Sequence, residues 1–205
     1  MMSDVAAVVL CGGESRRMGR PKAWLDFGHE TLLQRVVRLV SVVGGPVVVV
    51  AAPGQDLPPL PPSVRFARDA VARRGPLEGL LAGLKTLSRE SRFAYVTATD
   101  VPFLNPTWIT FLREVVGDDD LAIARLDGRY HPLAALYRVS AVLPVVERRL
   151  AAEQLRLLDL IESLKTRVIH DAELARVDPE GRTLQNLNTP DDYERALAEA
   201  GFKTA

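Results

Sequence analysis

The sequence predicts a three-layer α/β fold in which helices cover both faces of a mostly parallel sheet. Two kinds of segment alternate along its 205 residues: short apolar runs, and longer stretches with apolar residues at helical spacing. Continuous apolar runs are typical of strands that are buried on both faces, and such burial requires helices on either side. The composition, with 47% hydrophobic and 25% charged residues, is that of a folded domain, which we expect to span residues 1–205.

The first half of the chain carries three predicted strands and two predicted helices. Strands are expected at 5–10, 47–52 and 64–67, and helices at 32–43 and 77–87. Leucines or valines recur every three or four residues in both helical stretches, which places them on one face of each helix. The tract at 53–62 (PGQDLPPLPP) is rich in proline, so we expect an exposed loop there.

The second half repeats the alternation and adds a hairpin. Strands are expected at 93–98, 121–126 and 130–137, and helices at 106–116, 141–150 and 155–164. Asp127-Gly128 favours a tight turn, so we expect a hairpin and a small antiparallel part in the sheet. A last helix is expected between Thr189, which forms a capping box with Asp192, and Gly201.

Charge and cysteine content exclude several classes of protein. The 26 basic and 26 acidic residues give a formal net charge of zero, which argues against binding nucleic acid through bulk phosphate attraction. The single cysteine, Cys11, excludes an internal disulfide and a cysteine-rich metal site. No stretch resembles a signal peptide or reaches the roughly 20 apolar residues of a membrane-spanning helix. We therefore expect a cytoplasmic protein that binds neither nucleic acid nor a membrane.

A glycine-rich, basic segment follows the first predicted strand. Residues 10–22 read LCGGESRRMGRPK and carry Arg16, Arg17, Arg20 and Lys22. Glycine backbone can approach a ligand closely, its N–H groups can form an anion-binding nest, and open α/β sheets bind ligands at the carboxyl ends of their strands. The segment therefore indicates a triphosphate site, although it is neither a P-loop nor a dinucleotide fingerprint. A glycine-rich turn with solvated arginines is the alternative.

A carboxylate is expected at the same edge of the sheet. Asp100 follows the predicted strand at 93–98 almost directly. Because Mg²⁺ usually takes one or two protein carboxylates and completes its shell with phosphate oxygens and waters, Asp100 is a candidate magnesium ligand. The alternative role is to cap the helix that begins near Pro106.

These segments resemble the signature of the molybdenum cofactor guanylyltransferase (MobA) family, within the nucleotidyltransferase superfamily. Residues 10–22 resemble its L-[AC]-G-G-x-S-x-R-M-G…K pattern, and TDVPFL at 99–104 resembles its C-D-x-P-[FY]-[LI] pattern. Weaker similarities are Asp69 with GPLEG at 75–79, His131-Pro132, and NLNTP at 186–190. The resemblance spans Val8 to Tyr193 and implies a Rossmann-like α/β/α domain of the nucleotide-diphospho-sugar transferase type.

The resemblance also implies an activity and the residues that carry it. The enzyme would transfer GMP from GTP to the phosphate of molybdopterin, with Mg²⁺ as cofactor, and would release pyrophosphate and molybdopterin guanine dinucleotide. The catalytic residues would be Lys22, Arg17 and Asp100, with Asp100 as the metal ligand. GTP would contact Leu10, Cys11, Gly12, Gly13, Lys22, Asp69 and Asp100. The acceptor would contact Gly75, Pro76, Leu77, His131, Asn186 and Asn188. Transient contact with other molybdenum cofactor biosynthesis proteins or with acceptor proteins is a further implication.

Departures from the family pattern leave alternatives open. Guanylyl enzymes often have an asparagine that reads guanine after the second strand, where this chain has Val50-Ala51-Ala52-Pro53, and Pro21 replaces their usual aspartate. Gly12 favours guanine, because cytidylyl relatives tend to have alanine there, which leaves less room for a purine. A CTP-dependent molybdopterin cytidylyltransferase or another phosphate-ester nucleotidyltransferase is the nearer alternative. A non-catalytic nucleotide-binding module is the alternative from another class.

Overall fold

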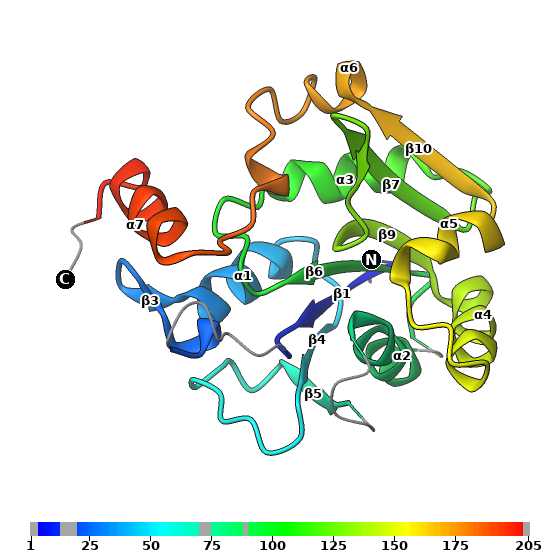
Figure 1. Ribbon diagram of the computed structural model, residues 1–205, viewed down its shortest axis with the longest axis horizontal. Helices are drawn as coiled ribbons and strands as arrows, with labels where there is room; N and C mark the ends of the chain where they lie inside the picture. The colour runs from blue at the N-terminus through cyan, green and yellow to red at the C-terminus, as the bar shows by residue number, and fades with distance from the viewer. Residues whose placement is uncertain (1–3, 13–19, 70–74, 88–89, 203–205) are drawn as a thin grey trace.

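The computed structural model describes residues 4–12, 20–69, 75–87 and 90–202, and its central feature is a twisted sheet (Figure 1). The strands of this sheet are β1 (Val5–Leu10), β4 (Val47–Ala51), β5 (Arg65–Arg68), β6 (Phe93–Ala98), β7 (Leu121–Leu126), β8 (Arg129–Tyr130), β9 (Ala134–Arg138) and β10 (Thr166–His170). Their order is β10-β7-β9-β6-β1-β4-β5, and β8 pairs with β7 only. A separate two-stranded ribbon is formed by β2 (Asp26–Phe27) and β3 (Glu30–Thr31).

The sheet is mostly parallel, as the sequence predicts. Strands β5, β4, β1 and β6 pair in parallel, and β10 pairs in parallel with β7. Strand β9 lies antiparallel between β6 and β7, and β8 is antiparallel to β7. The chain leaves β1 for β4 on one side and later returns for β6 on the other side. The carboxyl ends of β1 and β6 therefore lie at a point where the strand order reverses, which is where open α/β sheets bind ligands.

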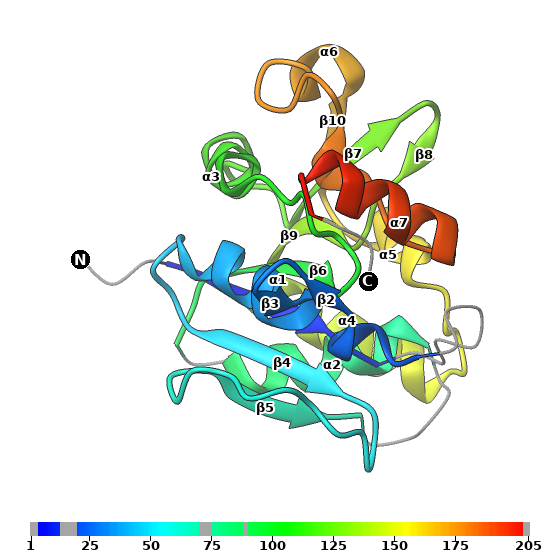
Figure 2. The ribbon, with the colours of Figure 1, turned by 90° about the vertical axis from the view of Figure 1, so that its left-hand side faces the viewer.

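Helices cover both faces of the sheet. The helices are α1 (Leu32–Ser41), α2 (Pro76–Leu87), α3 (Pro106–Val115), α4 (Val139–Ala151), α5 (Leu160–Ser163), α6 (Asp171–Leu174) and α7 (Pro190–Glu199), with the 3₁₀ turns η2 (Lys22–Trp24), η3 (Leu157–Asp159) and η4 (Arg182–Leu184). Figure 2 shows α1 and α3 on one side of the sheet and α2 and α4 on the other. Two core clusters follow this division: one joins α1 and α3 to residues such as Val9, and the other joins α2 and α4 to residues such as Val8. Successive strand residues thus point to opposite layers, and the predicted three-layer architecture is confirmed.

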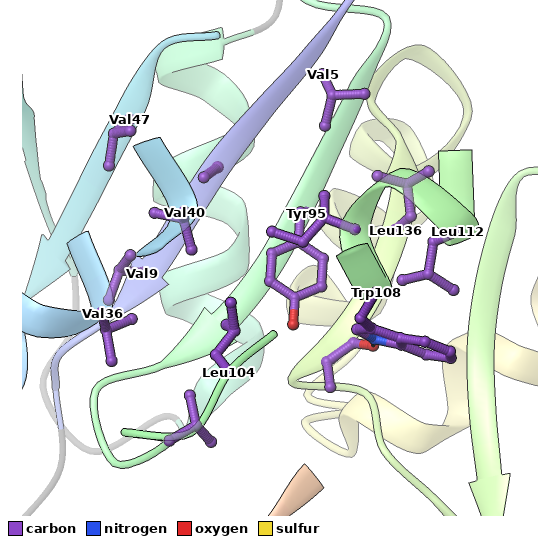
Figure 3. Packing of buried hydrophobic residues seen from close by; sticks show 14 of the residues in the cluster. Val5, Val9, Val36, Val40, Val47, Tyr95, Leu104, Trp108, Leu112 and Leu136 are labelled. Carbon is purple, nitrogen blue, oxygen red and sulfur yellow. The ribbon is translucent and has the colours of Figure 1, made fainter. Parts of the chain in front are cut away.

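The core over β6 is built from large aromatic and aliphatic side chains. Tyr95, Trp108, Leu112 and Leu136 are all buried and gather between the sheet and α3 (Figure 3). The Trp108 indole Nε1 donates to the Ala134 carbonyl oxygen at 3.0 Å, so its polar edge does not cost an unmade hydrogen bond. This packing fixes β6 and β9 side by side beneath the carboxyl edge of the sheet.

The predicted hairpin differs from the observed one. Asp127 and Gly128 form its turn with φ of 49° and 76°, but only β8 follows it, and the predicted strand at 130–137 divides. Pro132 lacks a backbone N–H and cannot continue a ladder, so the chain turns there and β9 begins at Ala134. β9 then pairs along its full length with β6 and only briefly with β7.

Two further segments differ from the sequence expectation. The helical stretch expected at 155–164 forms only η3 and α5, and the strand β10 was not predicted. β10 carries Arg167 and His170 and is mostly half-buried at the edge of the sheet, so it lacks the continuous apolar run that marks the inner strands.

The C-terminal helix confirms the predicted capping box. The Thr189 hydroxyl accepts from the Asp192 amide at 3.1 Å, and the Asp192 carboxylate accepts from the Thr189 amide at 2.9 Å. Leu197 of α7 packs with Phe27 of the β2–β3 ribbon in a third apolar cluster. Among the described residues, no helix is long and apolar enough to cross a membrane.

Candidate active site

An ion pair joins the two segments that the sequence assigns to phosphate and metal binding. Lys22 begins the turn η2, and Asp100 lies two residues beyond the end of β6. Lys22 Nζ lies 2.6 Å from Asp100 Oδ2, and the side chains are 22% and 12% exposed. Lys22, from the segment after β1, and Asp100, after β6, therefore meet at the carboxyl edge of the sheet.

The C-terminal segment completes the surroundings of Asp100. Asn186 Nδ2 donates to Asp100 Oδ1 at 2.9 Å, and the Leu187 amide donates to the Asp100 carbonyl oxygen at 2.9 Å. Thr99 Oγ1, one residue earlier, donates to the Leu10 carbonyl oxygen at 3.3 Å and ties the ends of β6 and β1 together. Asp100 is thus held by side chain and backbone, and it does not cap α3, whose N-cap is Asn105.

Gly12 lies where the ends of three parallel strands meet. The Cys11 amide donates to the Val50 carbonyl oxygen at 2.7 Å, so the chain follows β4 for one residue beyond β1. A Cβ at Gly12 would lie 3.3 Å from Asp69 Oδ2 and 3.6 Å from the Ala52 amide nitrogen. Asp69 itself follows β5. Because glycine has no side chain, the Gly12 backbone lies close to Asp69 and Ala52, and the space beside these two residues is not filled.

The Asp69 carboxyl is an acceptor with unused capacity. Its Oδ1 is buried and has no hydrogen-bond partner among the described residues. Burial, and secondly the charge of the nearby Glu78 carboxylate, raise the pKa of Asp69. A buried acceptor left unsatisfied is costly, and such groups are common where a ligand is to be bound.

Gln55 is a site residue that the sequence analysis missed. Its Oε1 accepts from the Ala52 amide at 3.0 Å, and its Nε2 donates to the Cys11 carbonyl oxygen at 3.1 Å. Arg68 Nη1 holds the Ala52 carbonyl oxygen at 2.9 Å. Gln55 therefore bridges the loops after β1 and β4. Its place within a proline-rich loop hid this role, and its position four residues after a strand end was the only local signal.

The remaining predicted residues are distributed as follows. Leu10 and Cys11 are buried, and burial raises the pKa of the Cys11 thiol. Gly75, with φ of 76°, and Pro76 are exposed where α2 begins, whereas the Leu77 side chain is fully buried in the core. Gly13 and Arg17 lie outside the described residues.

Two predicted acceptor residues lie near the same edge but outside the contacts of Asp100. His131 is half-buried and lies three residues before β9, whose first residue, Ala134, pairs with Thr97 near the end of β6. Burial, and secondly the charge of Arg129, lower the pKa of His131. Asn188 is exposed, and its backbone N–H donates to the Asp192 carboxylate at 3.0 Å.

The donor set is compatible with a divalent cation that a substrate helps to bind. Within the described ranges, no group of three or more histidine, cysteine or acidic side chains could hold a metal ion. The carboxylate of Asp100 is a hard oxygen donor, and the residue as a whole is only 9% exposed. Mg²⁺ sites that use one or two carboxylates and substrate phosphates have this character, so the residues present fit such an ion.

Comparison with known proteins identifies the family. The family model described as "MobA-like NTP transferase domain" matches residues 7–168. A protein of Mycobacterium avium named "Probable molybdenum cofactor guanylyltransferase" is 38% identical over 201 residues, with 96% of each chain covered. A protein of Methanosarcina mazei with the same name is 33% identical over 209 residues and covers 97% of this chain and 92% of its own length.

The fold agrees with this family. The crystal structure of molybdopterin-guanine dinucleotide biosynthesis protein A from Archaeoglobus fulgidus superposes with a TM-score of 0.76 at 24% identity, over 96% of this chain and 98% of the other. A 4-diphosphocytidyl-2C-methyl-D-erythritol synthase from Anaerococcus prevotii superposes with a TM-score of 0.68 at 15% identity, over 96% of both chains. The family model covers well over half of this sequence and confirms the resemblance carried by residues 10–22 and 99–104: the chain belongs to the MobA-like NTP transferase family.

Proposed function

We propose that this protein is a guanylyltransferase that transfers GMP from GTP to the phosphate of molybdopterin and releases pyrophosphate. The observation that carries the proposal is the contact between Lys22 Nζ and Asp100 Oδ2 at 2.6 Å. It brings a cation for phosphates and a carboxylate for a metal to one edge of the sheet. Relatives named as molybdenum cofactor guanylyltransferases, at 33% and 38% identity, support the same activity.

The main obstacle to this reaction is electrostatic. Two unit negative charges 4 Å apart repel by about 4 kcal/mol at an effective dielectric of 20, and a triphosphate meeting a phosphomonoester brings several such pairs together. Catalysis then consists mostly of positioning and charge neutralisation. Lys22 binds the phosphates and stabilises the charge on the leaving pyrophosphate, and Arg17 adds a second cation to the same group.

The nucleoside is proposed to lie over Gly12, with its base toward Asp69. A carboxylate only accepts hydrogen bonds, and guanine presents two neighbouring donors, N1–H and the 2-amino group. Cytosine places an acceptor at the corresponding ring nitrogen and matches a carboxylate less well. The Asp69 carboxylate, whose Oδ2 lies beside Gly12, and the absence of a side chain at Gly12 therefore favour guanine. Leu10, Cys11 and Gly13 are proposed to contact the same nucleoside through their backbone.

Asp100 is proposed to hold a divalent metal, which we infer to be Mg²⁺. When bound, the ion would polarise the α-phosphate and neutralise part of the triphosphate charge. The protein's share is to present a buried carboxylate whose orientation is fixed by its neighbours.

The acceptor needs no general base on the protein. A phosphomonoester is already ionised at neutral pH, so its oxygen attacks the α-phosphorus in line and the bond to the β-phosphate oxygen breaks. We retain as proposed acceptor contacts Gly75, Pro76, the backbone of Leu77, His131 and Asn188. Transient binding to other proteins of cofactor synthesis and a cytoplasmic location also stay predictions.

Pyrophosphate release tests the proposal. The protein is incubated with molybdopterin and each of GTP, CTP, ATP and UTP, with and without Mg²⁺. We expect release with GTP and Mg²⁺ only. Equal or greater release with CTP would assign the chain to the cytidylyl alternative, and no release with any nucleotide would favour a non-catalytic module.

Two substitutions connect the activity to the ion pair. Lys22→Ala should lower kcat by about 100- to 1000-fold, the usual effect of removing one group that stabilises transition-state charge. Asp100→Asn should abolish Mg²⁺-dependent turnover, and an unchanged metal titration would exclude Asp100 as a ligand. Arg38→Ala is a suitable control, since Arg38 lies on α1 and pairs with Glu30 outside the site. Full activity of the Lys22 variant would remove the phosphate role from this side chain.

A further inference from the structure

The amide of Asn186 makes a defined hydrogen bond to the carboxylate of Asp100. The donor is Nδ2, the acceptor is Oδ1, and the distance is 2.9 Å across 86 positions of sequence. An ionised carboxylate can only accept, so the amide must present its NH₂ group to Asp100 and turn its own oxygen away. The contact therefore has one orientation.

The segment that carries Asn186 is fixed on both sides of this residue. The Leu187 amide donates to the Asp100 carbonyl oxygen at 2.9 Å, and the Leu187 side chain is fully buried. Upstream, the buried Thr183 hydroxyl accepts from the backbone N–H of Asn105 at 3.0 Å. Downstream, Thr189 caps α7. Asn186 is thus held in place by the fold and does not reach Asp100 from a free loop.

The arrangement leaves Asp100 able to bind a cation. A carboxylate has about four acceptor sites, and Asn186 and Lys22 each take one, on different oxygens. The two donors differ in charge: the Lys22 ammonium repels a metal ion, whereas the neutral amide of Asn186 does not. Asn186 can keep its hydrogen bond while a divalent ion is bound to the same carboxylate.

We propose that Asn186 is a positioning residue that orients the Asp100 carboxylate toward the divalent metal. This inference rests on the proposed function, in which Asp100 is the metal ligand, and it gives Asn186 a role other than contact with the acceptor. Groups that hydrogen-bond a metal ligand set its orientation, and losing one costs roughly 10- to 100-fold in metal affinity.

The test measures metal binding without turnover. The full chain is bound to a GTP analogue with a methylene group between the α- and β-phosphorus atoms, with no acceptor, and is titrated with Mn²⁺ by electron paramagnetic resonance. Asn186→Leu keeps much of the side-chain volume and removes the donor, and Asn186→Ala provides a smaller variant should leucine disturb folding. We expect both to raise the Mn²⁺ dissociation constant about tenfold or more.

Two reference variants separate the possible failures. Gln185→Ala changes the adjacent residue, whose side chain lines a surface hollow with Arg182 and Glu199, and should leave Mn²⁺ affinity unchanged. Asp100→Asn should weaken Mn²⁺ at least as much as the Asn186 variants. If Asp100→Asn has no effect, the metal assignment of the proposed function fails. If Asp100→Asn weakens Mn²⁺ binding and the Asn186 variants do not, only the positioning role is overturned.

The kinetic constants supply a second readout. With metal held near its dissociation constant, a positioning role predicts a lower kcat for Asn186→Leu that excess Mn²⁺ restores, and little change in the KM of the acceptor. A raised acceptor KM with unchanged Mn²⁺ affinity would instead assign Asn186 to acceptor binding and overturn the inference.

Discussion

At the scale of single residues, the site depends on charged groups that are only partly satisfied by the protein. Asp100 is held by Lys22 and Asn186, whereas Asp69 keeps a buried oxygen without a partner among the described residues. The first arrangement fixes a carboxylate, and the second leaves an acceptor for a ligand. The unsatisfied oxygen of Asp69 costs stability, as is common for groups in functional sites.

Asp69 gives a prediction on pH. The pKa of Asp69 is raised in the folded protein. At a pH between its ordinary pKa and this raised pKa, the folded state therefore binds more protons than the unfolded state. The contribution of this carboxyl to the free energy of unfolding then falls as the pH rises. Asp69→Asn removes the penalty. The variant should have a higher Tm than the wild type at pH 7, and the difference should shrink as the pH is lowered toward the ordinary range of a carboxyl.

The same variant should bind GTP more weakly, because an NH₂ donor replaces one of the two acceptor oxygens that we propose for guanine. Thermal melts at several pH values and a GTP titration check the two effects together. Asp56→Asn, at an exposed position in the neighbouring loop, serves as the control. A lower Tm at pH 7 for Asp69→Asn would mean that the carboxylate is stabilised by contacts other than those described.

At the scale of elements, α2 packs on β1 with almost no space between them. A Cβ at Gly83 would lie 2.5 Å from Val8 Cγ1 and 3.4 Å from Val50 Cγ2. Gly83→Ala improves helix propensity by up to about 1 kcal/mol, but overpacking costs about 1–3 kcal/mol. We expect a net loss of stability in urea unfolding.

Val8→Ala provides the matched variant for this contact. Val8→Ala alone should be destabilising, since it opens a cavity. The double variant of Gly83→Ala with Val8→Ala should nevertheless be more stable than the sum of the two single effects predicts, because the smaller side chain of one change makes room for the larger side chain of the other. Additive effects would show that Gly83 and Val8 do not compete for the same space.

The cap of α7 gives a second prediction at this scale. Thr189→Ala removes the hydroxyl that accepts from the Asp192 amide and should cost about 1 kcal/mol. Thr189→Ser keeps an acceptor and should be close to the wild type. Hydrogen exchange of the α7 amides measures the effect, and equal protection in both variants would contradict it.

At the scale of the whole molecule, ligand binding should stabilise the fold through mass action. A ligand present at 100 times its dissociation constant adds about 2.7 kcal/mol to the free energy of unfolding. We expect GTP with Mg²⁺ to raise Tm more than CTP, ATP or UTP, and a chelator to reduce the shift. Differential scanning fluorimetry measures both. Equal shifts with all four nucleotides would remove the basis for guanine selectivity.

The sequence by itself determined the features that depend on neighbouring residues. The buried strands, the capping box at Thr189 and Asp192, and the turn at Asp127-Gly128 are local patterns of periodicity, capping and backbone preference. The candidate phosphate and metal segments after β1 and β6 are local patterns too, because glycine, basic and acidic residues that directly follow a buried strand can be recognised in the sequence. Their family signature has been confirmed by comparison.

Only the tertiary structure decided which distant segments meet. The insertion of β9 between β6 and β7, the bridge from Gln55 to Cys11, and the contact of Asn186 with Asp100 all join residues far apart in the sequence. Such contacts follow from strand order and from the packing of helices on the sheet, which no local window contains. The sequence could therefore name Asn186 and Asp100 separately, whereas the fold was needed to place one against the other.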